Sequence, residues 1–206
     1  MKTILINGAE NIGKTIFSVK LAQRLAQSNK VLLISLRRQK NNIEDYLDID
    51  DMITYDITDY FLKYAKLDKV ITSVCDLDII LSPFVEDKYK IEKEDIDKLL
   101  DKIEYDYLIV DDGDSNLFSD YISILITDSG YDKEINEDYF FVNKVDSSFD
   151  DRYYDFIINN KDKYLGYESL KNDYDFKIII DNLLNEDTKK VDKLSIFEKI
   201  KKKFRK

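Results

Sequence analysis

The chain has 206 residues, of which 44% are hydrophobic and 36% charged, and its formal net charge is −10. It contains no histidine and one cysteine, which excludes Ser-His-Asp triads, His-ligated zinc and an internal disulfide. The acidic balance argues against DNA binding by the body of the protein. No run approaches about 18 apolar residues, and the N-terminus enters a strand pattern at once, so we expect no spanning helix and no signal peptide. The single cysteine, Cys75, suits a reducing cytoplasm, where we expect the protein to lie.

The hydrophobic pattern predicts alternating strands and helices along the chain. The predicted strands are 2–7, 30–36, 77–84, 105–116 (ending in a carboxylate cluster), 121–127 and 139–145, and the predicted helices are 14–28, 56–65 and 93–104. Segments 40–55 and 146–163, dense in Asp, Asn and Tyr, are expected to be surface excursions. The alternation predicts an α/β fold, a three-layer sandwich with a mainly parallel sheet, over residues 1–190.

The most informative stretch is the loop between the first strand and the first helix. Gly8, Gly13, Lys14 and Thr15 meet the spacing G-x-x-x-x-G-K-[ST]. Backbone N–H groups of such a loop bind phosphate, and its lysine reaches the β- and γ-phosphates. Thr15 would hold Mg²⁺, and Asp111, at the end of a later apolar strand, would hold the ion through water.

We therefore predict a site for ATP and Mg²⁺, with a degenerate loop that binds nothing as the alternative. The predicted nucleotide contacts are the loop and the start of its helix: Gly8, Ala9, Glu10, Asn11, Ile12, Gly13, Lys14, Thr15 and Ile16.

Several segments resemble the MinD/ParA family of P-loop ATPases. ILINGAENIGKTIFSVKLAQRLAQSNKVLLISL (4–36) is similar to the family's opening, and YDYLIVDDG (105–113) to its Walker B segment. YDITDYF (55–61) resembles the helix after the first switch. FFVNKV (140–145) resembles the strand whose Asn contacts adenine, which implies that role for Asn143. The resemblance implies a P-loop NTPase fold and a role in spatial positioning, such as partitioning, division-site placement or localisation of a membrane apparatus.

The chain departs from the family pattern at positions associated with hydrolysis. The family loop reads K-G-G-x-G-K-[ST], and its first lysine crosses a dimer interface to the partner's nucleotide. Here that position is Ala9, and Glu10 and Asn11 replace the two glycines. The family's D-x-D, whose later Asp orients the attacking water, is replaced by Ser35 and Arg37. We expect ATP binding with weak or no hydrolysis, and slow turnover stays open. Glu10 would repel a γ-phosphate unless it faces solvent or pairs with a nearby arginine.

The end of the chain, 191–206, is predicted to be a basic amphipathic tail. From 193 to 206 there are seven basic residues against Glu198 alone. Such a helix suits an anionic membrane surface, and the tail also resembles the membrane-targeting helix of MinD. A last helix packed on the domain and a basic arm that contacts DNA stay open as alternatives. The predicted membrane-binding residues are Ile196, Phe197, Ile200 and Phe204.

The main hypothesis is a MinD/ParA-like ATP-binding protein that positions a cargo at the inner face of the cell membrane. It would act as a homodimer or with a hetero-partner of the same family, and two tails would strengthen membrane binding. The rival is a pseudo-ATPase adaptor that works through protein contacts without nucleotide turnover. A third hypothesis is an ATPase whose missing lysine comes from a different subunit.

Overall fold

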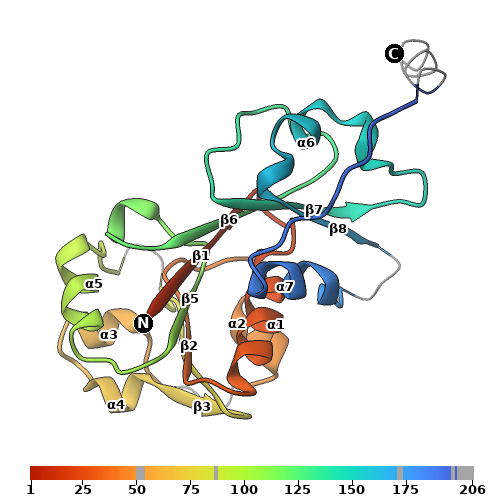
Figure 1. Cartoon of the computed structure of the whole chain (residues 1–206). Helices are drawn as coiled ribbons and strands as arrows, with labels where there is room; N and C mark the ends of the chain where they lie inside the picture. The colour runs from red at the N-terminus through yellow and green to blue at the C-terminus, as the bar shows by residue number, and fades with distance from the viewer. Residues whose placement is uncertain (50–53, 86–87, 171–173, 196–197, 199–206) are drawn as a thin grey trace. The chain divides into compact units, whose positions relative to one another are not determined.

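The computed structural model describes residues 1–49, 54–85, 88–170, 174–195 and 198 (Figure 1). The chain divides into two compact units, Met1–Ile124 and Leu125–Lys206. Strand β6 (Ile122–Thr127) runs across the boundary between them. In the described part of the chain, no helix is both long enough and apolar enough to cross a membrane.

The first unit is built on a sheet with the strand order β3-β4-β2-β5-β1. Its strands are β1 (Lys2–Gly8), β2 (Val31–Ser35), β3 (Thr72–Val74), β4 (Leu77–Ile80) and β5 (Tyr107–Asp111). All neighbouring strands are parallel except β3 and β4. The register aligns both Ile6 and Ser35 with Asp111, so three strands end together at one edge of the sheet.

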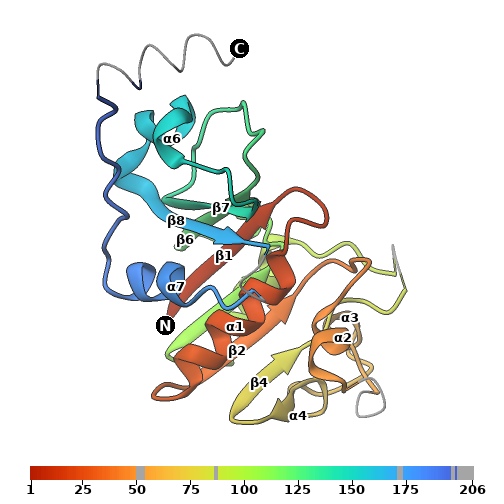
Figure 2. The same cartoon turned by 90° about the vertical axis from the view of Figure 1, so that its right-hand side faces the viewer.

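Helices cover both faces of this sheet (Figures 1 and 2). The helices of the first unit are α1 (Lys14–Ala26), α2 (Ile43–Leu47), α3 (Ile57–Phe61), α4 (Leu67–Val70), α5 (Lys93–Leu100) and the 3₁₀ turn η2 (Ser115–Leu117). α1 packs against β1, β2 and β5 on one face. On the other face, α3, α4 and α5 share one apolar cluster with Leu5, Leu32 and Leu108. Strands that are apolar on both faces require this double cover.

Helix α3 begins at a fully buried carboxylate. Asp56 accepts hydrogen bonds from the backbone N–H groups of Thr58 at 2.8 Å, Asp59 at 3.1 Å and Phe84 at 2.9 Å. The ammonium of Lys88 lies 3.2 Å from the same carboxylate. Burial raises the pKa of Asp56, but the hydroxyl of Thr58, the N–H groups of Phe84 and Asp59 and the ammonium of Lys88 all donate to the carboxylate and together hold the pKa below its usual value.

The second unit has an aromatic core. Its elements are β7 (Tyr139–Val145), β8 (Tyr164–Ser169), α6 (Asp155–Asn159), α7 (Lys177–Leu184) and the 3₁₀ turns η3 (Asp151–Tyr153) and η4 (Lys161–Lys163). β7 and β8 are parallel, with irregular register. The ring centres of Phe140 and Tyr164 lie 5.2 Å apart, and those of Phe141 and Phe176 lie 5.7 Å apart.

Each strand and helix predicted from periodicity is present, most of them with shorter ends. The segments 40–55 and 146–163 are not only surface excursions, because they contain α2 and α6. Ile43 and Ile157 are fully buried there. That expectation is wrong in part, since a single apolar side chain per turn anchors a short helix within a polar stretch.

Candidate functional site

The loop that joins β1 to α1 is shaped by residues in the left-handed region. Asn11 has a φ of 57° and Gly13 a φ of 99°. Asn tolerates this region better than other side chains, and glycine enters it without a steric penalty. Gly13 is the N-cap of α1, and no side-chain hydrogen bond caps that helix. The loop and the start of α1 therefore have the form of a phosphate-binding turn.

The ammonium of Lys14 lies inside this turn. It donates to the carbonyls of Gly8 and Ala9, both at 3.0 Å, and lies 3.3 Å from the carboxylate of Asp112. The side chain of Lys14 is only 6% exposed. The loop thus holds a nearly buried cation at its centre, and Asp112 balances the charge.

A second set of contacts joins α1 to the end of β5. The hydroxyls of Thr15 and Ser18 donate to the two carboxylate oxygens of Asp111, at 2.8 and 3.0 Å. Burial raises the pKa of Asp111 to about 6, and the charge of Asp112 adds to that effect. The two hydroxyl donors and Lys14 oppose the rise without cancelling it. A nearby cation would favour the ionised form of this carboxylate.

The oxygen ligands of this site fit Mg²⁺ if phosphate and water complete the coordination shell of the ion. A hydroxyl and a carboxylate are the hard oxygen ligands that Mg²⁺ prefers, and Thr15 and Asp111 bring them together. Among the described residues, no group of three or more His, Cys, Asp or Glu could hold a metal by itself. Mg²⁺ commonly binds through one or two protein oxygens plus substrate phosphates, which matches this arrangement.

A cavity of about 600 Å³ opens beside Lys14, at the carboxyl ends of β1, β2 and β5. The phosphate loop lines one part of it, and the turn that follows β2 lines another. Gln39 in that turn donates its amide hydrogen to Asp112. Ligands of parallel α/β sheets bind at this end of the strands, so the cavity lies where a nucleotide phosphate is expected.

Glu10 lines the cavity and is exposed to solvent. Arg38 lines the cavity too, but its guanidinium donates to the carboxylate of Glu44 at 2.9 Å. Ser35, in the place of the family's first Asp, is buried, and its hydroxyl donates to the carbonyl of Arg37 at 2.9 Å. Ser35 therefore shapes the turn after β2.

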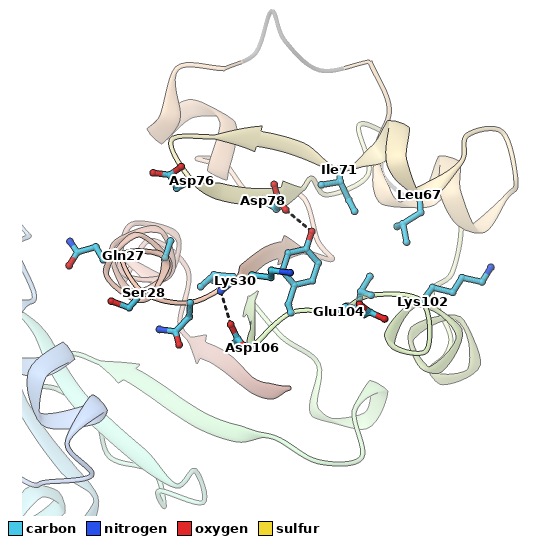
Figure 3. Close-up of a pocket in the computed structure, with 15 residues that line it drawn as sticks. Gln27, Ser28, Lys30, Leu67, Ile71, Asp76, Asp78, Lys102, Glu104 and Asp106 are labelled. Carbon is cyan, nitrogen blue, oxygen red and sulfur yellow. Dashed lines mark hydrogen bonds between the residues drawn. The ribbon is translucent and has the colours of Figure 1, made fainter.

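Figure 3 shows a second cavity, of about 820 Å³, where β2 and β5 begin. Asp78 and Asp106 line it, and both are already hydrogen-bonded. Asp78 accepts from the hydroxyl of Tyr105 at 2.7 Å, and Asp106 accepts from the N–H of Lys30 at 2.8 Å. Burial and Asp78 raise the pKa of Tyr105. These hydrogen bonds hold the strands together where they begin. The carboxylates of Asp78 and Asp106 would repel a phosphate.

Solved structures resemble this chain, although no protein-family model and no curated protein matches it. A putative plasmid partition protein from Borrelia burgdorferi B31, bound to AMPPNP, has a TM-score of 0.70 at 20% identity, and the match covers 90% of this chain and 97% of that one. The MinD cell division protein of Aquifex aeolicus has a TM-score of 0.68 at 17% identity, covering 93% and 100%. The septum site-determining protein MinD of Pyrococcus horikoshii OT3, complexed with Mg-ADP, has a TM-score of 0.57 at 22% identity, covering 71% and 72%.

The chain has the MinD/ParA fold. The α/β class and the mainly parallel sheet between helix layers are thereby confirmed. Within the MinD/ParA fold, Lys14 and Thr15 of the loop motif lie together with Asp111, which the end of an apolar strand singled out, in the first unit.

Five other predicted residues come after the first unit in the sequence. Asn143, the predicted adenine contact, is buried in β7 of the second unit, and its side-chain oxygen accepts from the N–H of Lys144 at 2.8 Å. Its role stays a prediction. The four predicted membrane-binding residues lie outside the described part of the chain: Ile196, Phe197, Ile200 and Phe204. Glu198, which is described, lies 3.0 Å from the guanidinium of Arg152.

Sequence reasoning missed two residues of the site. Ser18 follows Lys14 by one helical turn, so the motif and the helix period together could have found it. Gln39 contacts Asp112 from 73 positions away in the sequence. No local signal predicts that contact, because it depends on the alignment of β2 with β5.

Proposed function

We propose that the protein binds ATP with Mg²⁺ through residues 8–16 and serves in spatial positioning. The observation that carries the proposal is the Lys14 ammonium held inside a phosphate-binding turn, next to the Thr15 and Asp111 pair. Two proteins of the same fold support it, since one was bound to AMPPNP and the other to Mg-ADP.

Each part of the site would have a distinct task. The backbone of the loop and Lys14 would bind the β- and γ-phosphates, and Thr15 and Asp111 would hold Mg²⁺. Bound Mg²⁺ would neutralise phosphate charge. Asn143 would contact the adenine. Hydrolysis would be weak or absent, because Ala9 replaces the lysine that reaches the partner's nucleotide.

The positioning role rests on what the similar proteins are. They are a plasmid partition protein and MinD proteins of cell division and septum placement. We propose one nucleotide-binding domain over 1–190 that acts as a homodimer or with a related partner. The tail, 191–206, would bind an anionic membrane at the inner face of the cell.

Calorimetric titration of Mg-ATP and Mg-ADP into the purified chain tests nucleotide binding. Micromolar binding is expected for the wild type, and Lys14→Ala should abolish it. Lys20→Ala is the matched control, because Lys20 is an exposed lysine on the same helix and its loss should leave binding unchanged. If neither nucleotide produces heat or a thermal shift, the proposal fails.

Vesicle sedimentation tests the membrane role. The full chain should sediment with vesicles containing anionic lipid, and deletion of 193–206 should release it, because each basic residue near such a surface contributes about 1 kcal/mol. Equal sedimentation of the two proteins would contradict the membrane role of the tail.

A second candidate function is the pseudo-ATPase adaptor. The observation that favours it is that Lys14 already has three acceptors of its own chain: Gly8, Ala9 and Asp112. Because these acceptors already satisfy the Lys14 ammonium, the loop would keep its shape without a nucleotide. Absence of binding in the calorimetric titration would favour the adaptor.

A further inference from the structure

The phosphate cavity is lined by more basic side chains than its loop supplies. Lys14 comes from the loop, and Arg37, Arg38 and Lys40 come from the turn that follows β2. The acidic side chains on the same lining are those of Glu10 and Asp112. Four basic groups against two acidic ones leave the cavity cationic, which suits a polyanionic ligand.

The basic groups differ in whether their charge is already paired. Lys14 lies beside Asp112 at 3.3 Å. Arg38 is held by Glu44 at 2.9 Å, and its guanidinium lies 5.7 Å from the centre of the Phe84 ring.

Arg37 and Lys40 differ from them. Within the described ranges of the chain, neither side chain has a hydrogen bond or an ion pair, and both residues are exposed. They are the cavity cations that remain available to a ligand.

The turn that carries these two residues is fixed by its own contacts. The hydroxyl of Ser35 donates to the carbonyl of Arg37 at 2.9 Å, and the N–H of Gln39 donates to the side chain of Asn42 at 2.7 Å. The Gln39 amide also bonds Asp112, across the cavity lining. Arg37 is therefore presented to the cavity by a backbone that is held on both sides.

We propose that Arg37, assisted by Lys40, contacts the terminal phosphate of bound ATP and makes the site prefer ATP to ADP. The inference rests on the proposed function and deepens it. The charge of Lys14 is shared with Asp112, and Ala9 supplies no cation, so a further positive group is needed near the added phosphate. A planar guanidinium donates to two phosphate oxygens at once and keeps its charge at any physiological pH.

Titrations of Mg-AMPPNP and Mg-ADP test this assignment without interference from hydrolysis. Arg37→Ala should weaken AMPPNP binding about 10-fold or more, as expected for a lost charge-assisted hydrogen bond, and change ADP binding by less than about 3-fold. Lys40→Ala should show the same selectivity with a smaller loss, and Arg37→Lys should recover part of the affinity.

Lys20→Ala, which removes one exposed charge from α1, controls for the change in net charge. Thermal unfolding without nucleotide should be the same for all variants, since the side chains removed are exposed. Equal weakening of both nucleotides by Arg37→Ala, or no weakening, overturns this inference and leaves the proposed function standing. Absence of binding by the wild type overturns both.

Discussion

Two buried aspartates in the first unit illustrate the difference between a carboxylate that caps a helix and one that lies at the candidate site. Asp56, at the start of α3, accepts from three backbone N–H groups and has Lys88 beside it. Asp111, at the end of β5, has two hydroxyl donors and a second carboxylate next to it in the chain. Solvent does not reach either side chain, but Asp111 lies deeper in the protein; the pKa of Asp56 is lowered and that of Asp111 is raised to about 6.

The lesson is that hydrogen-bond supply, depth of burial and neighbouring charge together set the pKa of a buried carboxylate. Asp56 is satisfied by its own helix start and needs no further ligand. Asp111 is short of positive charge, and it lies where a phosphate-bound cation would be held. The predictions below test this contrast.

The largest expected effect comes from Asp56→Ala. It removes the acceptor for the N–H groups of Thr58 and Phe84 and leaves Lys88 with one carboxylate fewer. We expect a loss of about 3 kcal/mol in the free energy of unfolding, measured by urea denaturation. Asp114→Ala is the control, because Asp114 accepts from only one backbone N–H, at the start of η2. A loss for Asp56→Ala no larger than that of the control would contradict the structural role.

Asp111→Asn should raise the free energy of unfolding, whereas Asp56→Ala lowers it. The folded pKa of about 6 exceeds the usual 3.8, so the folded chain binds a proton more tightly than the unfolded chain does. The contribution of Asp111 to stability is therefore greatest below about pH 4 and falls as the pH rises to about 6. At pH 7, Asp111→Asn should stabilise the chain without nucleotide by roughly 2 kcal/mol.

The pH dependence separates this effect from a general change in packing. The difference in unfolding free energy between wild type and Asp111→Asn should shrink when the measurement moves from pH 7 to pH 4.5, because wild-type Asp111 is then protonated in the fold. A difference that does not change with pH would show that ionisation of Asp111 is not its cause. Asp111→Asn should also weaken the thermal shift that Mg-ATP produces.

Ser18→Ala should have a smaller effect. It removes one of the two hydroxyl donors to Asp111, which raises the pKa of that carboxylate further. We expect a loss of about 1 kcal/mol at pH 7, and less at pH 4.5. When Asp111 has already been changed to Asn, Ser18→Ala should cause almost no loss in the free energy of unfolding. An equal loss from Ser18→Ala in the wild type and in the Asp111→Asn background would mean that the two side chains do not interact.

The smallest effect is expected for Lys88→Met. Lys88 is 24% exposed and pairs with both Asp56 and Asp59. Partly exposed ion pairs contribute about 1 kcal/mol or less, and the backbone N–H groups would still satisfy Asp56. Urea denaturation at 0.05 and 0.5 M NaCl should show that the loss shrinks with salt. A loss as large as that of Asp56→Ala would assign the stabilisation of Asp56 to its charge pair.

The sequence by itself determined the fold class and the centre of the site. Apolar periodicity located the parallel strands and α1, and the glycine spacing located Lys14 and Thr15, because both signals act over a few residues. The apolar strand that ends at Asp111 identified the third residue. The segments β3, α4, β8 and α7 were not predicted, and α2 and α6 lie in segments expected to be surface excursions; β3 and α4 are three and four residues long, too short to show a periodic pattern.

Only the tertiary structure decided how these groups are charged and which of them are paired. The burial of Asp111, the pairing of Lys14 with Asp112, and the contact from Gln39 all join residues at the ends of different strands. Arg37 and Arg38 are neighbours in sequence with the same charge, yet among the residues that the structure describes a carboxylate pairs with Arg38 alone. The physical reason is that parallel pairing brings distant strand ends to one edge, where burial and partner supply depend on register.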